Sequence, residues 1–203
     1  MSLTNQKPYA PSAERNKQFI LETLKDELIS DDVVLEFGSG TGQHLSHFAA
    51  HLPDVTWQPT DLADKLPGIQ QWIAESGCQN ILAPLELDLS CTQNPDIKVS
   101  VCYSANTLHI VSWSLVGQLF RRAASLLGNT GKLCIYGPYK FNGQHISEGN
   151  QQFDLQLRSS DPDSGIRDTG ELDQLAIENG FSAARVISLP ANNHLLIWGR
   201  SRE

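Results

Sequence analysis

The sequence predicts a doubly wound α/β fold built on a mostly parallel sheet of seven strands. Short apolar runs rich in β-branched residues alternate with segments whose apolar residues recur at helical spacing. A glycine-rich segment, Gly38-Ser39-Gly40-Thr41-Gly42, separates the first such strand from the helix after it. Helices between successive strands imply parallel pairing with both sheet faces covered. The last two strands flank a short turn, so we expect an antiparallel C-terminal hairpin.

The first half of the chain is expected to hold three strands and three helices. The first helix begins near Pro11, and its apolar residues recur at helical spacing: Phe19, Ile20, Leu24 and Leu28. The strands are predicted over residues 33–37, 55–61 and 84–89, and the other helices over 43–50 and around 66–73. Each of these strands closes at or near an acidic residue.

The second half adds four strands and two helices. The strands are predicted over 99–105, 132–136, 185–189 and 194–199, and the helices over 115–127 and 170–179. Between them, residues 140–170 look like an irregular polar insertion that caps a pocket. We expect a single domain over 1–203, with residues 1–30 as an N-terminal helical segment.

The composition narrows the class of protein. The 203 residues carry a formal net charge of −8, which argues against a broad basic surface for nucleic acid. No apolar run is long enough to span a membrane. Cys102 and Cys134 lie in predicted core strands and no CxxC pair occurs, so we expect reduced cysteines, no metal site and a cytoplasmic location.

The glycine spacing predicts which nucleotide the loop receives. A dinucleotide fingerprint, G-x-G-x-x-G, needs its third glycine at position 43, where this chain has Gln43. Glu36 precedes the loop, and a carboxylate there would repel a pyrophosphate but favour a cationic ligand. The alternative is a plain turn that needs glycine for its backbone angles.

Two further acids support a nucleoside site. Asp61 follows Gly42 by 19 residues, at the distance where a carboxylate commonly accepts both ribose hydroxyls. A solvated strand-end residue is the alternative for Asp61. Asp88 ends the third predicted strand, and an N-cap for a following turn remains an open alternative to ligand binding there.

The run Glu36-x-Gly38-x-Gly40-x-Gly42 resembles the first motif of class I S-adenosylmethionine (SAM)-dependent methyltransferases, which implies their Rossmann-like fold and SAM as cofactor. Further strings resemble one uncharacterised methyltransferase-like family over nearly the whole chain: Ala13-Glu14-Arg15-Asn16, Gly40-Thr41-Gly42-Gln43-His44, Trp57-Gln58-Pro59-Thr60-Asp61, Asn106-Thr107-Leu108-His109-Ile110, Tyr136-Gly137-Pro138-Tyr139, Gly165-Ile166-Arg167-Asp168 and Pro190-Ala191-Asn192-Asn193. Ser164 departs from this pattern, which has Trp there.

The resemblance implies a set of cofactor-binding residues. These residues are the acid before the glycine loop, the loop itself, two strand-end acids with the leucines after them, an asparagine after the fourth strand and two polar residues near the start. They are Glu36, Gly38, Ser39, Gly40, Gly42, Asp61, Leu62, Asp88, Leu89, Asn106, Arg15 and Asn16. Asp88 would take the adenine amino group. The resemblance supplies no acceptor substrate.

Ligands of this fold lie beyond the carboxyl ends of the strands, so the loops after strands four and five should flank the substrate. Asn106 is predicted to orient an acceptor and His109 to take its proton. Tyr136 and Tyr139 are predicted to line the substrate, with Tyr139 also in a catalytic role. A histidine bonded to the backbone and ordinary tyrosine packing are the alternatives.

The insertion and the hairpin add substrate-binding candidates. Phe153, Arg158, Arg167 and Asn192 are assigned to this role, the arginines for a carboxylate or phosphate. The alternative is that Arg167 pairs with Asp163 or Asp168 to hold the loop, and that Asn192 makes the hairpin turn. The spacing of the aspartates over 161–168 does not match a calcium-binding loop, so we interpret that segment as a turn.

The function predicted from these features is SAM-dependent methyl transfer to a small molecule. Three alternatives remain: a SAM-binding protein without catalysis, a protein or nucleic-acid methyltransferase, and a nicotinamide-dependent oxidoreductase. The glycine spacing and Glu36 argue against the last, and the acidic charge argues against nucleic acid as a partner. No membrane partner is expected, and the sequence does not predict an oligomeric state.

Overall fold

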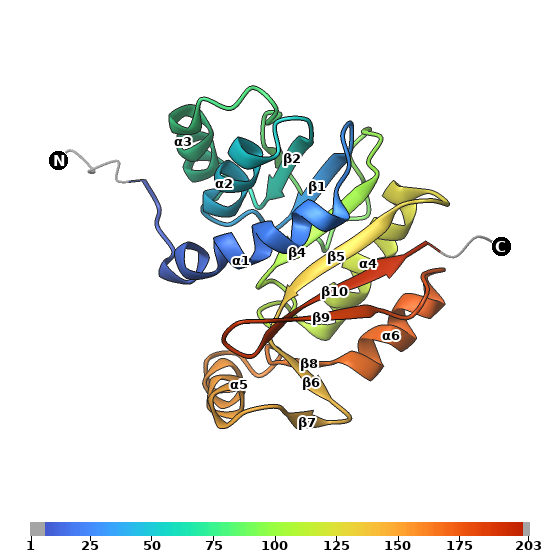
Figure 1. Ribbon diagram of the computed structural model, residues 1–203. Helices are drawn as coiled ribbons and strands as arrows, with labels where there is room; N and C mark the ends of the chain where they lie inside the picture. Colours follow the sequence, from blue (N-terminus) through green and yellow to red (C-terminus); the bar gives the residue numbers. More distant parts are fainter. Residues whose placement is uncertain (1–6, 201–203) are drawn as a thin grey trace. The chain divides into compact units, whose positions relative to one another are not determined.

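A computed structural model describes residues 7–200 of the chain. The chain divides into two compact units, residues 1–88 and 89–203. Each unit contains parallel strands with helices packed beside them, as Figure 1 shows. The prediction that residues 1–203 act as one domain stays a prediction.

The first unit is built on three parallel strands in the order β3-β2-β1. β1 (Val33–Phe37) pairs with β2 (Thr56–Asp61) over five residues, from Val33 opposite Thr56 to Phe37 opposite Thr60. The prediction of β3 was too long, because only Leu85–Glu86 pairs with β2. Both residues of β3 are exposed, so this short edge strand gains no stability from buried side chains that would favour a longer strand.

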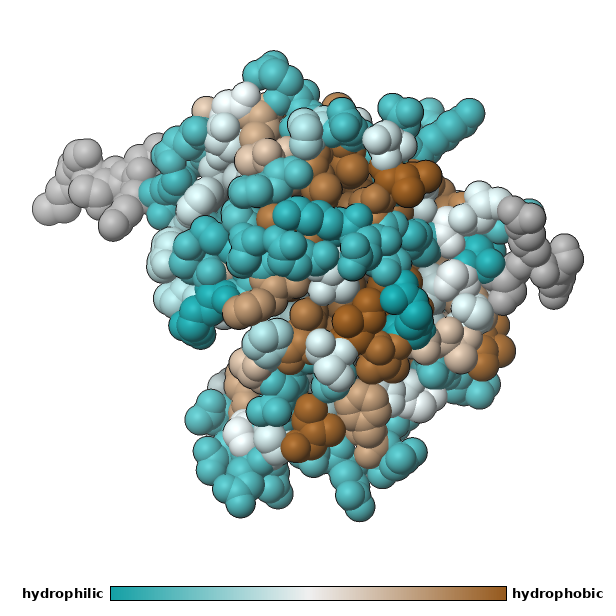
Figure 2. Space-filling view, in the orientation of Figure 1, coloured by the Kyte–Doolittle hydropathy of each residue, from teal (hydrophilic) through white to brown (hydrophobic). Residues whose placement is uncertain are grey.

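Three helices complete the first unit: α1 (Pro11–Glu27), α2 (Gln43–His51) and α3 (Leu66–Ser76). α2 lies between α1 and α3 and packs against both. Ile20, Leu24 and Leu28 of the predicted apolar side are buried, but Phe19 is 48% exposed. Phe19 lies outside the buried side of the helix, which Ile20 and Leu21 occupy. Figure 2 shows that the face of α1 turned to the viewer is hydrophilic.

The second unit is built on four strands in the order β4-β5-β10-β9. β4 (Val101–Ala105) and β5 (Lys132–Gly137) are parallel, while β10 (Asn193–Gly199) runs antiparallel to both β5 and β9 (Arg185–Leu189). The predicted hairpin is confirmed, and its turn holds Ala191 and Asn192 at positive φ. Cys102 and Cys134 are buried in β4 and β5, as predicted.

Helices α4 (Trp113–Leu127) and α6 (Thr169–Glu178) belong to the second unit and contact each other. Their predicted counterparts began two residues late and one residue late, respectively. With three strands in the first unit and four in the second, the predicted α/β class is confirmed, including the seven-stranded, mostly parallel sheet and its antiparallel hairpin.

The sequence suggested that the polar insertion is irregular, but the structure shows regular elements there. The insertion forms a second, three-stranded sheet in the order β7-β6-β8 and one helix: β6 (Tyr139–Phe141), β7 (Gln144–His145), α5 (Glu148–Ser160) and β8 (Arg167–Asp168). The helix escaped prediction because its buried residues are Asn150 and Asp154, so it carries no apolar stripe. No helix within residues 7–200 is both long and apolar enough to cross a membrane.

Candidate functional site

The glycine loop follows β1 and leads into α2. Gly38, Gly40 and Gly42 have φ of 70°, 60° and 88°, in the left-handed region that disfavours residues with a side chain. A Cβ at Gly42 would lie 3.1 Å from Trp72 Cβ and 3.2 Å from Ile69 Cα, so this glycine lets the loop pack against α3. A Cβ at Gly40 would meet nothing within 4 Å, and Gly40 is exposed, so its backbone is open to a ligand.

Hydrogen bonds to β2 hold this loop in place. The backbone N–H groups of Gly38 and Ser39 both donate to the carbonyl of Thr60, at 3.0 Å. The Thr60 hydroxyl donates to the carbonyl of Glu36 at 2.7 Å, and the Thr60 N–H donates to Ser39 Oγ at 3.2 Å. Thr60, which is fully buried, therefore fixes the loop at both of its sides.

Asp61 ends β2 directly beside the loop. One carboxylate oxygen accepts the N–H of Gly40 at 2.7 Å, and the other accepts the N–H of Leu62 at 2.8 Å. Burial raises the pKa of Asp61 above its ordinary value, although both backbone hydrogen bonds act against the rise. Each oxygen keeps further acceptor capacity, so the side chain is oriented and still able to accept a ligand's hydroxyls.

Glu36 is the least satisfied polar group of this region. It is 1% exposed, and its Oε2 atom has no hydrogen-bond partner among the described residues. Burial raises the pKa of its carboxyl to about 7, a hydrogen bond with Ser39 acts against this rise, and the nearby Asp61 carboxylate adds to it. A buried carboxylate without a counter-cation is costly, so this position favours a ligand that brings a positive charge.

The predicted residues near the start divide into two cases. Asn16 Oδ1 lies 2.6 Å from Nε2 of His44, which joins α1 to the helix that begins at the glycine loop. Arg15 is exposed on α1. The string around residues 13–16 and the string around residues 40–44 are therefore joined in the structure. The cofactor-binding roles of Arg15 and Asn16 stay predictions.

Asp88 and Leu89 lie past the end of β3, and both are partly buried. Asp88 is the last residue of the first unit and Leu89 is the first of the second. Because β3 ends at Glu86, Asp88 does not close a strand, which corrects its predicted position. Its proposed contact with adenine stays a prediction.

In the second unit, the end of β4 places the residues predicted to face the acceptor. Asn106 has a positive φ of 58°, and its N–H donates to the carbonyl of Tyr136 at 2.9 Å. His109 is 6% exposed, and its ring meets the Phe153 ring edge-on, with the centroids 5.4 Å apart. A Cβ at Gly137 would lie 3.8 Å from His109 Nδ1 and 3.9 Å from the Tyr139 hydroxyl. His109, Phe153 and Tyr139 are therefore gathered around the end of β5.

His109 is a neutral imidazole at physiological pH. Burial lowers its pKa to about 4, and the charge of Arg167 lowers it further. None of the side-chain hydrogen bonds in the described part of the chain uses its ring, so one nitrogen remains able to accept a proton.

The Tyr139 hydroxyl makes a hydrogen bond within the fold, and its predicted catalytic role stays a prediction. Tyr139 is 1% exposed, and its hydroxyl donates to the carbonyl of Ile135 at 3.0 Å. Burial raises the pKa of this phenol well above its ordinary value, so it does not supply a base near neutral pH. Tyr136 is 3% exposed and lies in β5, next to Ile135, and its predicted place beside a substrate stays a prediction.

Arg167 likewise serves the fold. It is 8% exposed, and its guanidinium donates to the carbonyls of Leu108, Val111 and Asp163 at 2.9, 2.5 and 2.8 Å. The alternative in which Arg167 holds its loop is therefore the better description, through the backbone of Asp163 instead of its carboxylate.

The other two polar substrate candidates also make contacts inside the protein. Arg158 forms an ion pair with the buried Asp154 at 3.3 Å, while its own side chain is 43% exposed. Asn192 takes its predicted place in the hairpin turn at φ 57°, and its carbonyl accepts a hydrogen bond from Asn150 Nδ2 at 3.1 Å. Their predicted contacts with a substrate remain untested.

The segment 161–168 forms turns and caps, as its interpretation required. Asp161 Oδ1 accepts the N–H of Asp163, and Asp168 Oδ1 accepts the N–H of Gly170 at the start of α6. Ser164, which replaces the expected Trp, is 3% exposed and donates to two carbonyls, those of Leu157 and Asp161. A small hydroxyl therefore closes the turn after α5.

Two buried residues without a role predicted from the sequence, Asp154 in the second unit and Gln43 in the first, make several hydrogen bonds within their own units. Asp154 is 6% exposed and accepts from the N–H of Ile166 at 2.6 Å and from Nε2 of His145 at 3.0 Å. Gln43 is 2% exposed, and its side-chain oxygen accepts a hydrogen bond from the N–H of Ala10, the residue before α1. The i, i+4 pair of Asp154 with Arg158 was the available signal for the first, and the departure from the dinucleotide pattern was the signal for Gln43.

Comparisons with known proteins agree with this fold. A family model described as "Protein of unknown function (DUF938)" matches residues 7–200. The chain is similar to three solved structures at a TM-score of 0.80, over 94% of its length: the SAM-dependent methyltransferase SibL in its apo form (17% identity, 56% of that chain), an O-methyltransferase family protein from Burkholderia thailandensis (19%, 57%) and human N-acetylserotonin methyltransferase in complex with SAM (14%, 53%). The chain thus spans a little over half the length of these structures. The predicted resemblance to class I methyltransferases is confirmed for the fold.

Proposed function

Because the chain belongs to the family described as "Protein of unknown function (DUF938)", whose description assigns no activity, we propose a function from the site itself: SAM-dependent methyl transfer to a small-molecule acceptor. The observation that carries this proposal is the buried carboxyl of Glu36 beside the glycine loop, with one oxygen that has no partner among residues 7–200. The ligand that fits there brings a cation and a nucleoside.

The charge requirement separates SAM from other nucleotides. SAM carries an ammonium on its methionine part and a positive sulfonium, whereas a nicotinamide dinucleotide carries a negative pyrophosphate. At the raised pKa of about 7, Glu36 ionises readily when an ammonium approaches and gains a charge-assisted hydrogen bond. A pyrophosphate would instead face two acidic side chains, Glu36 and Asp61.

The nucleoside requirement is met by Asp61 and the exposed backbone at Gly40. The two backbone N–H donors hold the Asp61 carboxylate at the loop, and each of its oxygens still has a lone pair for one ribose hydroxyl. Gly40 leaves room for an adenosyl group to approach the main chain closely, because nothing lies within 4 Å of its missing side chain. These features support Glu36, Gly38, Ser39, Gly40, Gly42, Asp61 and Leu62 as cofactor-binding residues.

SAM, when bound, supplies an electrophilic methyl group on its sulfonium. The protein has to position the acceptor, exclude water and receive the proton that an acceptor hydroxyl or amine loses. We assign proton acceptance to the neutral imidazole of His109 and acceptor orientation to the side chain of Asn106. Phe153 lies against the His109 ring and shields it. Tyr139 is left out of the chemistry because Ile135 holds its hydroxyl.

The solved structures support a small-molecule acceptor, and oxygen as the methylated atom. They include an O-methyltransferase family protein and human N-acetylserotonin methyltransferase. The net charge of −8 agrees with a small-molecule partner and with the absence of nucleic acid. A cytoplasmic location remains part of this proposal.

A titration with S-adenosylhomocysteine (SAH), followed by calorimetry at pH 8, tests the cofactor assignment. We expect saturable binding in the micromolar range by the wild type and binding at least ~10-fold weaker by Glu36→Gln, the loss typical of a hydrogen bond to a charged group. The matched control is Glu22→Gln, a substitution of the same kind on an exposed residue of α1 that does not line the pocket among α1, α2 and α3. The absence of SAH binding at millimolar concentration would refute the proposal, and so would tight binding of NADH.

Two observations favour a second candidate, a SAM- or SAH-binding protein without catalysis. A pKa of about 4 makes His109 a weak base, and the Tyr139 hydroxyl is engaged with the main chain. Incubation with SAM labelled on its methyl group and a broad set of phenols, alcohols and amines separates the two candidates. Methyl transfer that His109→Ala abolishes supports the enzyme, while SAH binding without any labelled product supports the alternative.

A further inference from the structure

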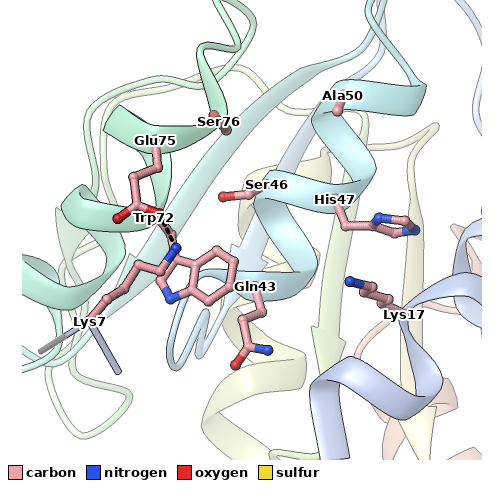
Figure 3. Close-up of a pocket in the computed structure, with 9 residues that line it drawn as sticks. All are labelled: Lys7, Lys17, Gln43, Ser46, His47, Ala50, Trp72, Glu75 and Ser76. Atoms are coloured by element: carbon pink, nitrogen blue, oxygen red, sulfur yellow. Dashed lines mark hydrogen bonds and ion pairs between the residues drawn. The ribbon is translucent and has the colours of Figure 1, made fainter. Parts of the chain in front are cut away.

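We propose that a pocket on the helical side of the first unit binds a small organic anion that carries a carboxylate or phosphate group. The pocket has a volume of about 290 Å³ and lies among α1, α2 and α3. Figure 3 shows its lining; the residues on which the proposal depends are Lys7, Lys17, Gln43, Ser46, His47 and Trp72. Neither Glu36, Gly40 nor Asp61 lines it, so it is separate from the proposed cofactor site.

A buried hydroxyl without a partner lies on the wall of this pocket. Ser46 is 8% exposed, and its Oγ atom has no hydrogen-bond partner among the described residues. A serine inside a helix can donate to the carbonyl four residues earlier, but Ser46 does not bond to Gly42 in this way. Figure 3 shows its side chain projecting from α2 toward α3. A ligand oxygen would satisfy this donor, whose burial is otherwise unfavourable.

Two lysines bring positive charge to the same pocket. Lys17 pairs with Glu14 at 2.6 Å, and Lys7 pairs with Glu75. The lysine side chains are 26% and 27% exposed, whereas their glutamate partners are 40% and 61% exposed. The lysine side chains are thus more sheltered than the glutamate side chains. Exposed ion pairs of this kind contribute little, so an anion in the pocket can share or replace the glutamates.

The remaining charged and titratable groups agree with an anionic occupant. His47 is neutral, because burial lowers its pKa to about 4 and the charges of His51 and Lys17 lower it further. Its Nε2 atom lies 3.1 Å from Oε1 of Gln18, a residue that does not line the pocket. Among residues 7–200, Glu75 is the one acidic residue that lines the pocket, and it is already paired with Lys7.

The Trp72 face that meets Lys7 is not open to a ligand that binds by stacking. The face of Trp72 is covered by the Lys7 ammonium, 3.6 Å from the ring centroid, and the indole N–H donates to the carbonyl of Pro8 at 2.8 Å. A volume of about 290 Å³ is at the lower end of the range for small-molecule sites. We therefore expect recognition through the anionic group, by Lys17 and Ser46.

The pocket is also connected to the glycine loop. Gln43 accepts the N–H of Ala10 at 2.5 Å and the hydroxyl of Thr41 at 3.1 Å, and Gly42 packs against Trp72. An anion that orders these residues should also change the affinity of the loop for its own ligand, and the coupling must be reciprocal. This last consequence rests on the proposed function, whereas binding of the anion itself does not.

The test is a titration of the full chain with inorganic phosphate and, separately, with citrate, followed by ¹H–¹⁵N NMR. Ionic strength is held constant with sodium chloride. We expect saturable shifts of the Ser46 and His47 amides and of the Trp72 indole N–H, with at least ~10-fold weaker binding in Lys17→Gln and in Ser46→Ala. The matched control is Lys25→Gln, because Lys25 forms an i, i+3 pair with Glu22 on the same helix but does not line the pocket.

Three outcomes would overturn the proposal: shifts that do not saturate, equal shifts with sodium chloride alone, or an equal loss of affinity in Lys25→Gln. Ser46→Ala removes an unpaired buried hydroxyl, so its melting temperature should not fall, and lost anion binding at unchanged stability identifies a binding role. SAH titrations with and without phosphate report the coupling separately. Saturable anion binding with no SAH binding would therefore refute the proposed function and leave the pocket proposal supported.

Discussion

Substitution of Glu36 by glutamine should make the protein more stable and, at the same time, a poorer binder of SAH. The carboxyl has an ordinary pKa of 4.5, which burial raises to about 7 in the folded protein. Between these two values the folded state holds a proton that the unfolded state has lost. The contribution of Glu36 to the free energy of unfolding is therefore most favourable below pH 4.5 and is lost as the pH rises from 4.5 through 7.

The size of this effect follows from the difference between the two pKa values. A difference of one pH unit corresponds to about 1.4 kcal/mol, so the free energy of unfolding should fall by about 3 kcal/mol between pH 4.5 and pH 8 through this one group. Glutamine has nearly the same shape and does not titrate. The stability difference between Glu36→Gln and the wild type should therefore grow by about 3 kcal/mol over the same interval.

Urea unfolding at a series of pH values measures this quantity. Any pH-independent effect of the new amide group shifts every point equally and cancels in the difference between pH 4.5 and pH 8. The matched control is Glu75→Gln, whose side chain is 61% exposed and whose stability difference should stay constant within ~0.5 kcal/mol. A stability difference for Glu36→Gln that does not change with pH would refute the reasoning, because it would mean that burial does not raise the pKa of Glu36.

Binding supplies the second half of the same prediction. Because an ammonium requires the carboxylate form, wild-type affinity for SAH should rise with pH and level off above pH 7, whereas that of Glu36→Gln should be low and independent of this group. Calorimetric titrations between pH 5.5 and 8.5 measure both curves. If Glu36→Gln is more stable than the wild type but binds SAH less tightly, Glu36 serves ligand binding at a cost in stability.

Other consequences of the structure can be tested in the same way. Gly42→Ala should destabilise the protein by ~2 kcal/mol or more, since it combines a φ of 88° with a Cβ contact of 3.1 Å to Trp72, while Gly40→Ala, which has open space, should cost about 1 kcal/mol. Urea unfolding compares them, and equal losses would contradict the packing argument. Arg167→Met should cost at least ~2 kcal/mol, because three carbonyls lose their donor, while Arg158→Met on the surface should cost less than ~1 kcal/mol. A stable Arg167→Met variant would instead support the predicted role in substrate binding. The imidazole of His109 should titrate near pH 4 by NMR, and a midpoint near 6.5 would show that it is not buried as described.

Local sequence patterns predicted the elements that the backbone encodes by itself. β1, the glycine loop, α2 and the C-terminal hairpin were found within two residues, because apolar periodicity, glycine and asparagine each act over a few neighbouring residues. The same patterns placed Glu36 and Asp61 at the ends of neighbouring parallel strands. They failed for α5, where the buried side chains are Asn150 and Asp154, and for β3, which is held by only two residues.

The state of each side chain was decided by tertiary structure. The sequence by itself determined that an acid precedes the glycine loop, but only the folded unit removes Glu36 from water and leaves one of its oxygens without a partner. Likewise, Tyr139 and Arg167 carry suitable groups for a site. The Tyr139 hydroxyl, however, donates to the carbonyl of Ile135, four residues earlier, and Arg167 donates to the carbonyls of Leu108 and Val111, which are distant in sequence. A pattern shows which chemical groups are available, whereas burial and the supply of partners determine which of them remain free for a ligand, since both depend on residues far apart along the chain.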